Sequence, residues 1–450
     1  MKKSIIIAAV IAIAAGCAQK NPVLEVTGGK LQGVESDTPG VLVYKGIPYA
    51  APPVGDLRWQ VPQPVVAWEG VKVADSFGPI CPQPGNKPGT FYGDEFYWQG
   101  TPEESEDCLY LNVWAPAATV GKAEAGLPVA MWVHGGAYMN GYGYEVTMDG
   151  EAWAERGVIL VTINYRLGNL GFLSHPMLSE EQDGRSGNYG MLDQVAALEW
   201  IHKNISAFGG DPENITILGQ SAGAMSIKNL VTSPLSKDMV AKAIIQSGGG
   251  IGGANLGGGN DTPQSVYDAQ GKAIMDANGW TTLEQMRNAS TAEILGAAAK
   301  AGRFAMLSPH PDGYFMTEDF NAAAAAGRIA DIPYMIGCTS QDMGGLGGES
   351  INTFCKVRSE QSEHPAYQYF FQRNLPGDDE DPAKDPGAFH SSELWYMFGT
   401  LDKSWRPFTE ADYELSSAMV DAWTSFCKSG NPGWDAYTAE NPVIKVFDVE

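Results

Sequence analysis

The sequence predicts an α/β fold: a mostly parallel central sheet with helices on both faces, preceded by a small antiparallel sheet at the N-terminus. Three observations predict it. Several nearly continuous apolar runs are typical of strands buried on both faces. Helical stretches lie between these runs, as they do where parallel strands need crossover connections. The 54 Gly and 28 Pro among 450 residues indicate more turns than a helix bundle tolerates.

The predicted elements form a single domain, because no internal repeat or low-complexity linker divides the chain. Short alternating stretches with turns in residues 23–75 favour the small antiparallel sheet. Apolar runs predict buried strands at 127–133, 158–163, 215–218, 243–245 and 332–336. Apolar residues at helical spacing predict helices at 191–206, 224–230 and 410–428. We expect one domain over residues 17–450.

Residues 1–16 are predicted to be a secretory signal and not part of the fold. Lys2 and Lys3 precede an apolar run that is too short to span a bilayer. The run ends in Ala-Ala-Gly-Cys at residues 14–17, which resembles a bacterial lipobox, so Cys17 is expected to be lipidated and to become the first mature residue. We therefore expect an exported protein anchored by lipid in the bacterial envelope, at the outer membrane or in the periplasm. An ordinary cleaved signal and a secreted protein are the alternative.

Charge and cysteine content narrow the class of protein. The chain has 29 Lys and Arg against 53 Asp and Glu, a net charge of −24, which argues against a nucleic-acid partner. An oxidising envelope permits disulfides, and Cys81 and Cys108 enclose a loop that one would stabilise. The pairing of the other cysteines stays open. The Cys and His spacing does not indicate a zinc site, and no metal or cofactor is expected.

A serine-centred motif carries the predicted chemistry. Gly219-Gln220-Ser221-Ala222-Gly223 follows a predicted strand and precedes a predicted helix. This is the context of a nucleophile elbow, a sharp turn that lifts the serine hydroxyl clear of the sheet. The turn also places Ser221 at a helix N-terminus, where the helix dipole favours developing negative charge.

A serine nucleophile needs a general base and an acid that orients it. The chain order Ser, acid, His of α/β-hydrolases leaves His310, His364 and His390 as the base. His390 fits best, because it lies in a loop that enters the C-terminal helical region. Asp342 follows the predicted strand at 332–336 and is the expected acid. The alternatives to it are Asp331 and Glu349.

Two glycine-rich segments follow predicted strands. His134-Gly135-Gly136-Ala137 is expected to turn backbone N–H groups toward an oxyanion, with the N–H of Ala222 as a further donor. Residues 248–253 match the spacing of a dinucleotide-binding fingerprint. Glycines continue to residue 259 with no helix to receive a pyrophosphate, so we interpret this segment as an active-site loop.

The chain resembles the type-B carboxylesterase family, the acetylcholinesterase-like branch of the α/β-hydrolases, from about residue 24 to the end. The motifs that carry the resemblance are KGIPYA at 45–50, PVGDLRW at 53–59, SEDCLYLNV at 105–113, NYRLG at 164–168 and AFGGDP at 207–212. The resemblance implies Ser221 as nucleophile, His390 as base, an oxyanion hole from Gly135, Gly136 and Ala222, a Cys81–Cys108 disulfide, and Ser247 as a buried serine that supports the triad.

Departures from the family pattern also carry information. The family's acid is commonly Glu in an Asp-Glu-Gly triplet, and here the aligned residues are Gln341-Asp342-Met343. The residue before the nucleophile is usually Glu, and Gln220 removes that negative charge. Trp98 lies at the spacing before Cys108 at which cholinesterases place a cation-binding Trp, so we assign it to the substrate pocket as a buried or gorge-wall aromatic. The chain is shorter than most of the family, which favours an open site.

The predicted function is a serine carboxylic-ester hydrolase that cleaves small or aryl carboxylic esters through a Ser-His-Asp triad and an acyl-enzyme intermediate. Its partner is a small ester substrate, and it meets the membrane only through its lipid. The alternatives are an esterase that removes acetyl or feruloyl groups from plant polysaccharide and a catalytically silent binding protein on the same fold. Acyl and alcohol specificity, membrane face and oligomeric state stay open.

Overall fold

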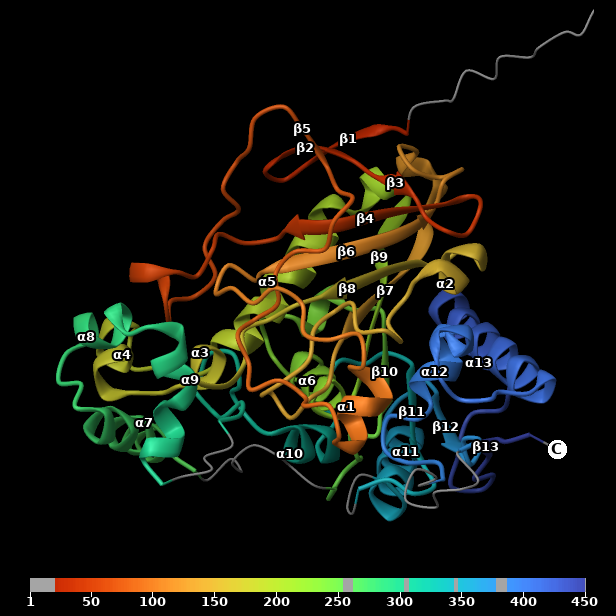
Figure 1. Cartoon of the computed structure of the whole chain (residues 1–450). Coiled ribbons are helices and arrows are strands. Elements are labelled where there is room, and N and C mark those ends of the chain that lie inside the picture. The colour runs from red at the N-terminus through yellow and green to blue at the C-terminus, as the bar shows by residue number, and fades with distance from the viewer. Residues whose placement is uncertain (1–20, 254–261, 303–306, 344–346, 378–386, 450) are drawn as a thin grey trace, which may run out of the picture.

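The computed structural model describes residues 21–253, 262–302, 307–343, 347–377 and 387–449. Strands and helices alternate along most of this chain (Figure 1). The strands are β1 (Val23–Val26), β2 (Gly29–Gln32), β3 (Val34–Glu35), β4 (Val41–Pro48), β5 (Val71–Val73), β6 (Tyr110–Pro116), β7 (Leu127–Val133), β8 (Ile159–Ile163), β9 (Gly210–Gln220), β10 (Lys242–Gln246), β11 (Tyr334–Thr339), β12 (Ala366–Phe371) and β13 (Ile444–Phe447).

A ten-stranded sheet in the order β13-β12-β11-β10-β9-β7-β8-β6-β4-β3 forms the centre of the molecule. Its strands are parallel from β13 to β8 and antiparallel from β8 to β3. The buried strands that the sequence predicts correspond to β7 to β11, so the mostly parallel sheet is confirmed.

The N-terminal region differs in part from the prediction. A separate three-stranded sheet, β1-β2-β5, is present, but β5 pairs with β2 in parallel. Strand β4, which lies within the residues predicted to form the small sheet, instead joins the central sheet, where it pairs with β6. The reason is burial: six of the eight residues of β4 are buried, which the edge of a small sheet cannot provide.

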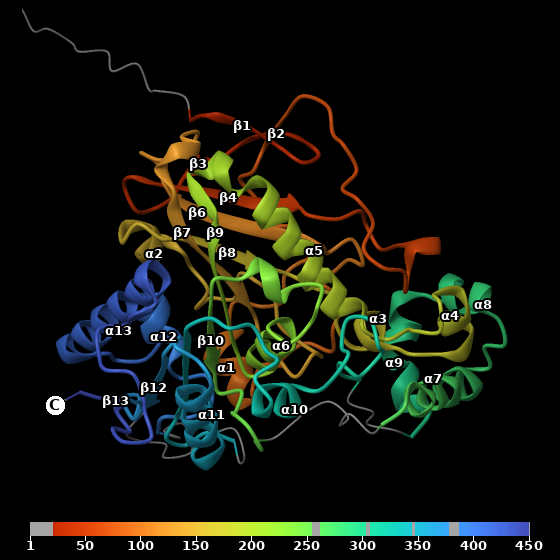
Figure 2. The ribbon, with the colours of Figure 1, turned by 180° about the vertical axis from the view of Figure 1, so that it is seen from behind.

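Helices cover both faces of the central sheet (Figure 2). They are α1 (Phe91–Phe96), α2 (Glu151–Glu155), α3 (Gly168–Phe172), α4 (Pro176–Glu181), α5 (Tyr189–Asn204), α6 (Ala222–Leu230), α7 (Gln264–Asn278), α8 (Leu283–Asn288), α9 (Thr291–Lys300), α10 (Phe320–Ala325), α11 (Glu349–Gln361), α12 (Leu394–Phe398) and α13 (Glu410–Ser429). The three predicted helices correspond to α5, α6 and α13. Helix α13 begins after the capping residue Thr409 and ends at Gly430, which adopts φ 75°.

The two helical layers bury alternate residues of the same strands. In β7, Met131 and Val133 belong to the core that includes α5 and α6, whereas Ala130 and Trp132 belong to the core that includes α12 and α13. Successive side chains of a strand point to opposite faces, so a strand covered on both faces must be apolar throughout. This explains why β7 has a continuous apolar run.

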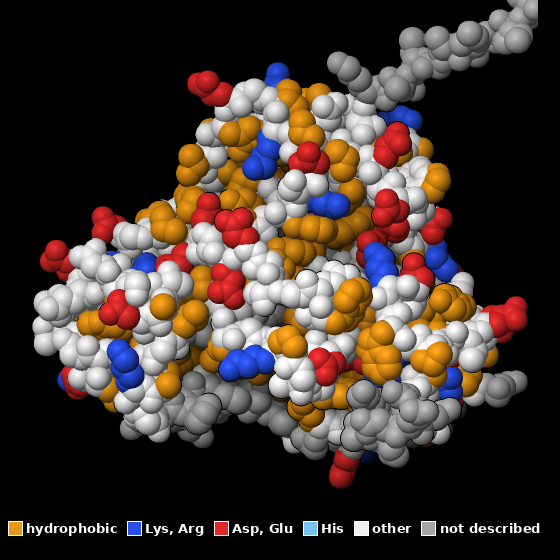
Figure 3. Space-filling model, viewed as in Figure 1, with side chains coloured by type: hydrophobic (Ala, Val, Ile, Leu, Met, Phe, Trp, Pro, Cys, Tyr) orange, Lys and Arg blue, Asp and Glu red, His pale blue; other side chains and the backbone are white. Residues whose placement is uncertain are grey.

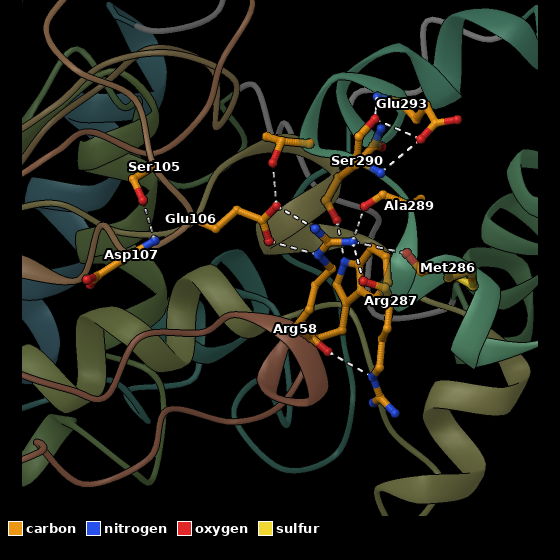
Figure 4. Close-up of polar contacts among 12 residues, drawn as sticks. Arg58, Ser105, Glu106, Asp107, Met286, Arg287, Ala289, Ser290 and Glu293 are labelled. Atoms are coloured by element: carbon orange, nitrogen blue, oxygen red, sulfur yellow. Dashed lines mark hydrogen bonds and ion pairs between the residues drawn. The ribbon is translucent and has the colours of Figure 1, made fainter.

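Arg58 attaches the helices at one end of the molecule to the N-terminal region (Figure 4). Its guanidinium forms a bidentate ion pair with Glu106, at 2.6 and 2.8 Å, and both side chains are nearly buried. Its Nη1 also donates to the carbonyl oxygens of Met286, Arg287 and Ala289. Arg58 therefore binds the C-terminal end of α8, where carbonyl groups lack helical partners. This contact joins two of the motifs that carry the resemblance, at residues 53–59 and 105–113.

The structure does not contain the predicted disulfide between Cys81 and Cys108. Cys81 and Cys108 are both buried free thiols in the structure, and they lie close enough for a thiol hydrogen bond. Backbone hydrogen bonds join the ends of the enclosed loop instead: Ile80 N–H donates to Glu103 O at 2.9 Å, and Ser105 N–H donates to Ile80 O at 3.0 Å. The loop is thus closed without a covalent bond.

The predicted signal segment and Cys17 lie outside the described residues. Within the residues that the structure describes, no helix is both long and apolar enough to cross a bilayer.

Candidate active site

Ser221 lies at the sharp turn between β9 and α6. Its backbone adopts φ 58° and ψ −124°, a conformation that non-glycine residues rarely take. The turn is held in place because Ser221 N–H donates to Gln246 O at the end of β10, at 2.9 Å. The strand, strained turn and helix have the geometry of a nucleophile elbow.

His390 and Asp342 lie together at the same edge of the sheet. His390 Nδ1 is 2.5 Å from Asp342 Oδ1, and the two side chains are only 7% and 6% exposed. Their loops are aligned by a parallel bridge between Gln341 and Phe389, in which Gln341 N–H donates to Ala388 O. This bridge places the residue after Gln341 opposite the residue after Phe389, which brings the carboxylate to the imidazole.

Gln220 occupies the other side of the His390 ring. Gln220 Nε2 lies 3.2 Å from His390 Nε2 and 3.5 Å from His390 Nδ1, so its amide rests against the face of the imidazole ring. Because the Asp342 carboxylate can only accept, His390 Nδ1 carries a proton directed at Asp342. Ser221 Oγ forms no hydrogen bond to a described residue.

The predicted oxyanion loop approaches the nucleophile closely. A Cβ placed on Gly135 would lie 2.8 Å from Gln220 O and 3.1 Å from Ser221 Cβ, so only glycine fits there. Gly136 adopts φ 101°. The N–H groups of Gly135 and Gly136 donate to no acceptor among the described residues, and that of Ala222 is the first of α6, which has no intrahelical acceptor.

The neighbouring His134 adds no charge to this loop. Burial lowers the pKa of His134 to about 4, and its ring is stacked on Tyr165. Its Nδ1–H donates to Gly135 O at 2.8 Å. The donors available to an oxyanion are therefore neutral backbone groups.

Behind the triad lies a buried acid that sequence reasoning did not single out. Glu393 is fully buried, and burial together with the nearby negative charge of Asp342 raises its pKa to about 8. The side chains of Gln246 and Ser247 lie within hydrogen-bonding reach of this carboxyl group and offset part of the rise in pKa. Ser247 adopts φ 53°, and its N–H donates to Gly337 O at 2.8 Å. In the sequence, Glu393 could have been found by its position three residues after His390.

Two aromatic residues of α1 and its end were also missed. Tyr92 OH donates to His390 O at 3.1 Å, and Tyr97 OH donates to Glu145 in the oxyanion loop segment at 2.8 Å. Burial raises the pKa of Glu145 to about 7. The middle of the 81–108 loop thus contacts both His390 and the segment that follows Gly135 and Gly136. No sequence motif indicates these contacts.

Other candidates lie elsewhere. His310 is buried, stacked on Tyr267, with Nε2 3.0 Å from Ser186 O, and His364 is exposed. Trp98 follows α1 and is 51% exposed, so it is not a buried aromatic. The alternative acids do not meet His390.

Asp331 and Glu349 occupy unrelated positions. Asp331 pairs with Arg358 at 2.7 Å, with its side chain 65% exposed, and Glu349 is the exposed first residue of α11. The glycine segment at 248–253 is a loop after β10, and the glycines at 257–259 lie outside the described residues. No helix begins within 248–253.

Comparison with known proteins identifies the family to which the chain belongs. The sequence profile described as the carboxylesterase family matches residues 20–363 and 347–445. The chain belongs to the carboxylesterase family. It is 34% identical to para-nitrobenzyl esterase of Bacillus subtilis, over 94% of each chain, and 41% identical to phenmedipham hydrolase of Pseudarthrobacter oxydans, over 95% of each.

The fold agrees with the family. The solved structure of a thermophilic PNB esterase superimposes with a TM-score of 0.82 at 31% identity, covering 95% of this chain and 96% of that one. The α/β-hydrolase fold, the family and the activity predicted from the sequence are therefore confirmed, and this chain is a carboxylesterase.

Proposed function

We propose that this carboxylesterase cleaves its substrates with Ser221 as nucleophile, His390 as general base and Asp342 as the acid that orients His390. The observation that carries the proposal is the 2.5 Å contact between His390 Nδ1 and Asp342 Oδ1, next to an elbow whose serine adopts φ 58°. A buried carboxylate that accepts from Nδ1 leaves Nε2 as the proton acceptor, which is the arrangement that serine activation requires.

In the acylation step, Ser221 Oγ attacks the ester carbonyl carbon while His390 Nε2 takes the hydroxyl proton. The hydrogen bond between Nε2 and the Ser221 hydroxyl forms when substrate binds, since catalytic hydrogen bonds commonly tighten only then. The carbonyl oxygen becomes an oxyanion that accepts from the N–H groups of Gly135, Gly136 and Ala222. The tetrahedral intermediate collapses, and His390 gives its proton to the departing alcohol.

The deacylation step repeats this chemistry with water. Water loses a proton to His390 Nε2 and attacks the acyl-enzyme carbonyl, and the second tetrahedral intermediate releases the carboxylic acid and returns the proton to Ser221. Asp342 stabilises the imidazolium during both steps. Gln220 packs against the face of the His390 ring, and we assign it and Ser247 the role of supporting the triad.

The substrates we propose are small or aryl carboxylic esters. Support comes from the similar proteins, since a para-nitrobenzyl esterase and a phenmedipham hydrolase are named for aryl compounds. The shorter chain favours an open site, and Trp98 at its half-exposed position stays a candidate for contact with the alcohol group. We also propose that the enzyme is exported and anchored by lipid on Cys17, because residues 14–17 resemble a lipobox.

The test is Ser221→Ala in the full chain. It is expected to abolish hydrolysis of p-nitrophenyl acetate and covalent labelling by a fluorophosphonate probe, with an unchanged thermal unfolding midpoint. Ser359→Ala is the matched control, since Ser359 lies on α11 and bonds only to Lys356 O; it should keep both activities. Turnover by the Ser221→Ala variant, or undiminished labelling, would refute the proposed nucleophile.

A further inference from the structure

The N-terminal sheet, β1-β2-β5, presents an unusual face to solvent. In the strand register, Val23 pairs with Gln32 and Gln32 with Val73, while Glu25 pairs with Lys30 and Lys30 with Val71. Alternate side chains of a strand share one face, so these six residues form one surface, which we call the outer face. Leu24 and Leu31 point the other way and are buried.

The outer face is apolar and has no net charge. Val23, Val71 and Val73 are 47%, 45% and 51% exposed, although valine side chains are normally buried. The two charged residues neutralise each other, because Lys30 Nζ lies 3.6 Å from Glu25 Oε1. In a chain of net charge −24 this face lacks the excess of carboxylates that would repel an anionic surface. Figure 3 shows hydrophobic side chains at this upper end, with side chains of both charges among them.

The sheet lies on the side of the molecule opposite the active site. Thr27 N–H, in the turn between β1 and β2, donates to Asn204 Oδ1 at the C-terminal end of α5, at 2.7 Å. Helix α5 ends where β9 begins, whereas Ser221 follows the last residue of β9. The sheet and the nucleophile are therefore separated by the length of β9 (Figure 1).

We propose that the outer face rests on the headgroup region of the phospholipid bilayer that holds the lipid of Cys17. This inference rests on the lipid anchor proposed above. Val23 is the sixth residue after Cys17, and six fully extended residue steps span about 20 Å, so a lipidated Cys17 keeps β1 next to the membrane surface. The face that meets the bilayer is the one that carries three exposed valines and no net charge.

The consequence for function is the direction of the active site. With the outer face against the bilayer, the catalytic edge of the sheet points into the aqueous phase. The enzyme then takes its esters from solution and not from the lipids of the membrane that holds it.

Hydrogen exchange on a tethered chain tests this orientation. The described cysteines are all buried, so Cys17 of the mature chain is the thiol to couple to maleimide-phosphatidylethanolamine in vesicles of phosphatidylethanolamine and phosphatidylglycerol. Compared with the same chain coupled to a soluble maleimide, amides of residues 23–32 and 71–73 are expected to exchange about fivefold more slowly. Amides of β13, at another edge of the molecule, should be unchanged. Equal exchange in both samples, or slowing at β13 instead, would overturn the orientation.

A pair of double variants isolates the outer face. V71D with V73D should remove the slowing, whereas I444D with V446D, on β13 and similarly exposed, should keep it. Both should hydrolyse p-nitrophenyl acetate at the wild-type rate, which verifies folding; if V71D with V73D is misfolded, the wild-type comparison alone decides. Mass measurement of the exported protein tests the anchor separately. A Cys17 without lipid in that protein refutes the anchor, and the coupled vesicles still decide whether the face docks.

Discussion

Replacing Asp342 by Asn removes the charge of the proposed triad acid while it keeps the side-chain size. Asp342 Oδ1 accepts from both His390 Nδ1 at 2.5 Å and the N–H of Met343 at 2.8 Å, whereas Oδ2 receives only a 3.4 Å contact from the N–H of Thr339. We expect the Asn oxygen to take the first position, because two donors meet there. The geometry is then retained, and the loss of activity measures the charge.

The size of the loss follows from the contact distance. The 2.5 Å contact places the centres of the carboxylate and the imidazolium about 4 Å apart, where two charges interact by about 4 kcal/mol at an effective dielectric constant near 20. The imidazolium exists only during the proton-transfer steps, so this energy is lost from the transition state. Since 1.36 kcal/mol is a factor of ten, kcat is expected to fall about 10³-fold.

The assay is the initial rate of p-nitrophenyl acetate hydrolysis at pH 8, with the thermal unfolding midpoint of each variant measured alongside. Glu349→Gln is the control, because Glu349 was a sequence candidate for the acid and is exposed at the start of α11; its rate should stay within twofold of wild type. A fall of less than tenfold for Asp342→Asn, or a larger effect from Glu349→Gln, would refute the assignment of Asp342.

Two further substitutions test the surroundings of the triad. Gly135→Ala should lower kcat for p-nitrophenyl acetate more than 100-fold with KM little changed, because the added Cβ would lie 2.8 Å from Gln220 O and displace the oxyanion loop; a rate near wild type would show that this loop does not form the hole. Glu145→Gln should change how stability depends on pH: the folded-state pKa of Glu145 is about 7 against 4.5 in the unfolded chain, so its contribution is fully present below pH 4.5 and is lost as pH rises through 7. In urea unfolding, wild type should lose about 3 kcal/mol relative to the variant between pH 4.5 and 8, and parallel pH profiles would contradict this.

Most of the central sheet could be predicted because burial on both faces leaves a mark in the sequence. In β7 every position must be apolar, and the run at 127–133 has the same bounds as the strand. The N-terminal region could not be assigned in the same way. The stretch at 41–48 has the composition of either an edge strand or an inner strand, and only its pairing with β6, more than 60 residues away, decides between them.

The candidate site could likewise be predicted only where local restrictions act on the residues. The strained turn at Ser221 and the close approach at Gly135 could be predicted because each restricts which residues fit. The contact between Asp342 and His390 depends on the bridge between Gln341 and Phe389, a long-range pairing that sequence does not encode locally. Cys81 and Cys108 show that a family resemblance can also mislead. It implied a disulfide, but both residues are free thiols and backbone contacts close the loop.

The charges around His390 bear on which esters this enzyme accepts. At position 220 the family's usual Glu is replaced by Gln, and the raised pKa of Glu393, about 8, keeps that acid largely protonated at neutral pH. The two acids beside the proposed base are then Asp342, which faces the imidazole, and Glu393, which is largely neutral. A cationic alcohol group would find little electrostatic attraction in such a site, so we expect neutral esters to be preferred. Since the proposed orientation directs the site toward solution, those esters would be water-soluble ones, which agrees with the small and aryl esters inferred above.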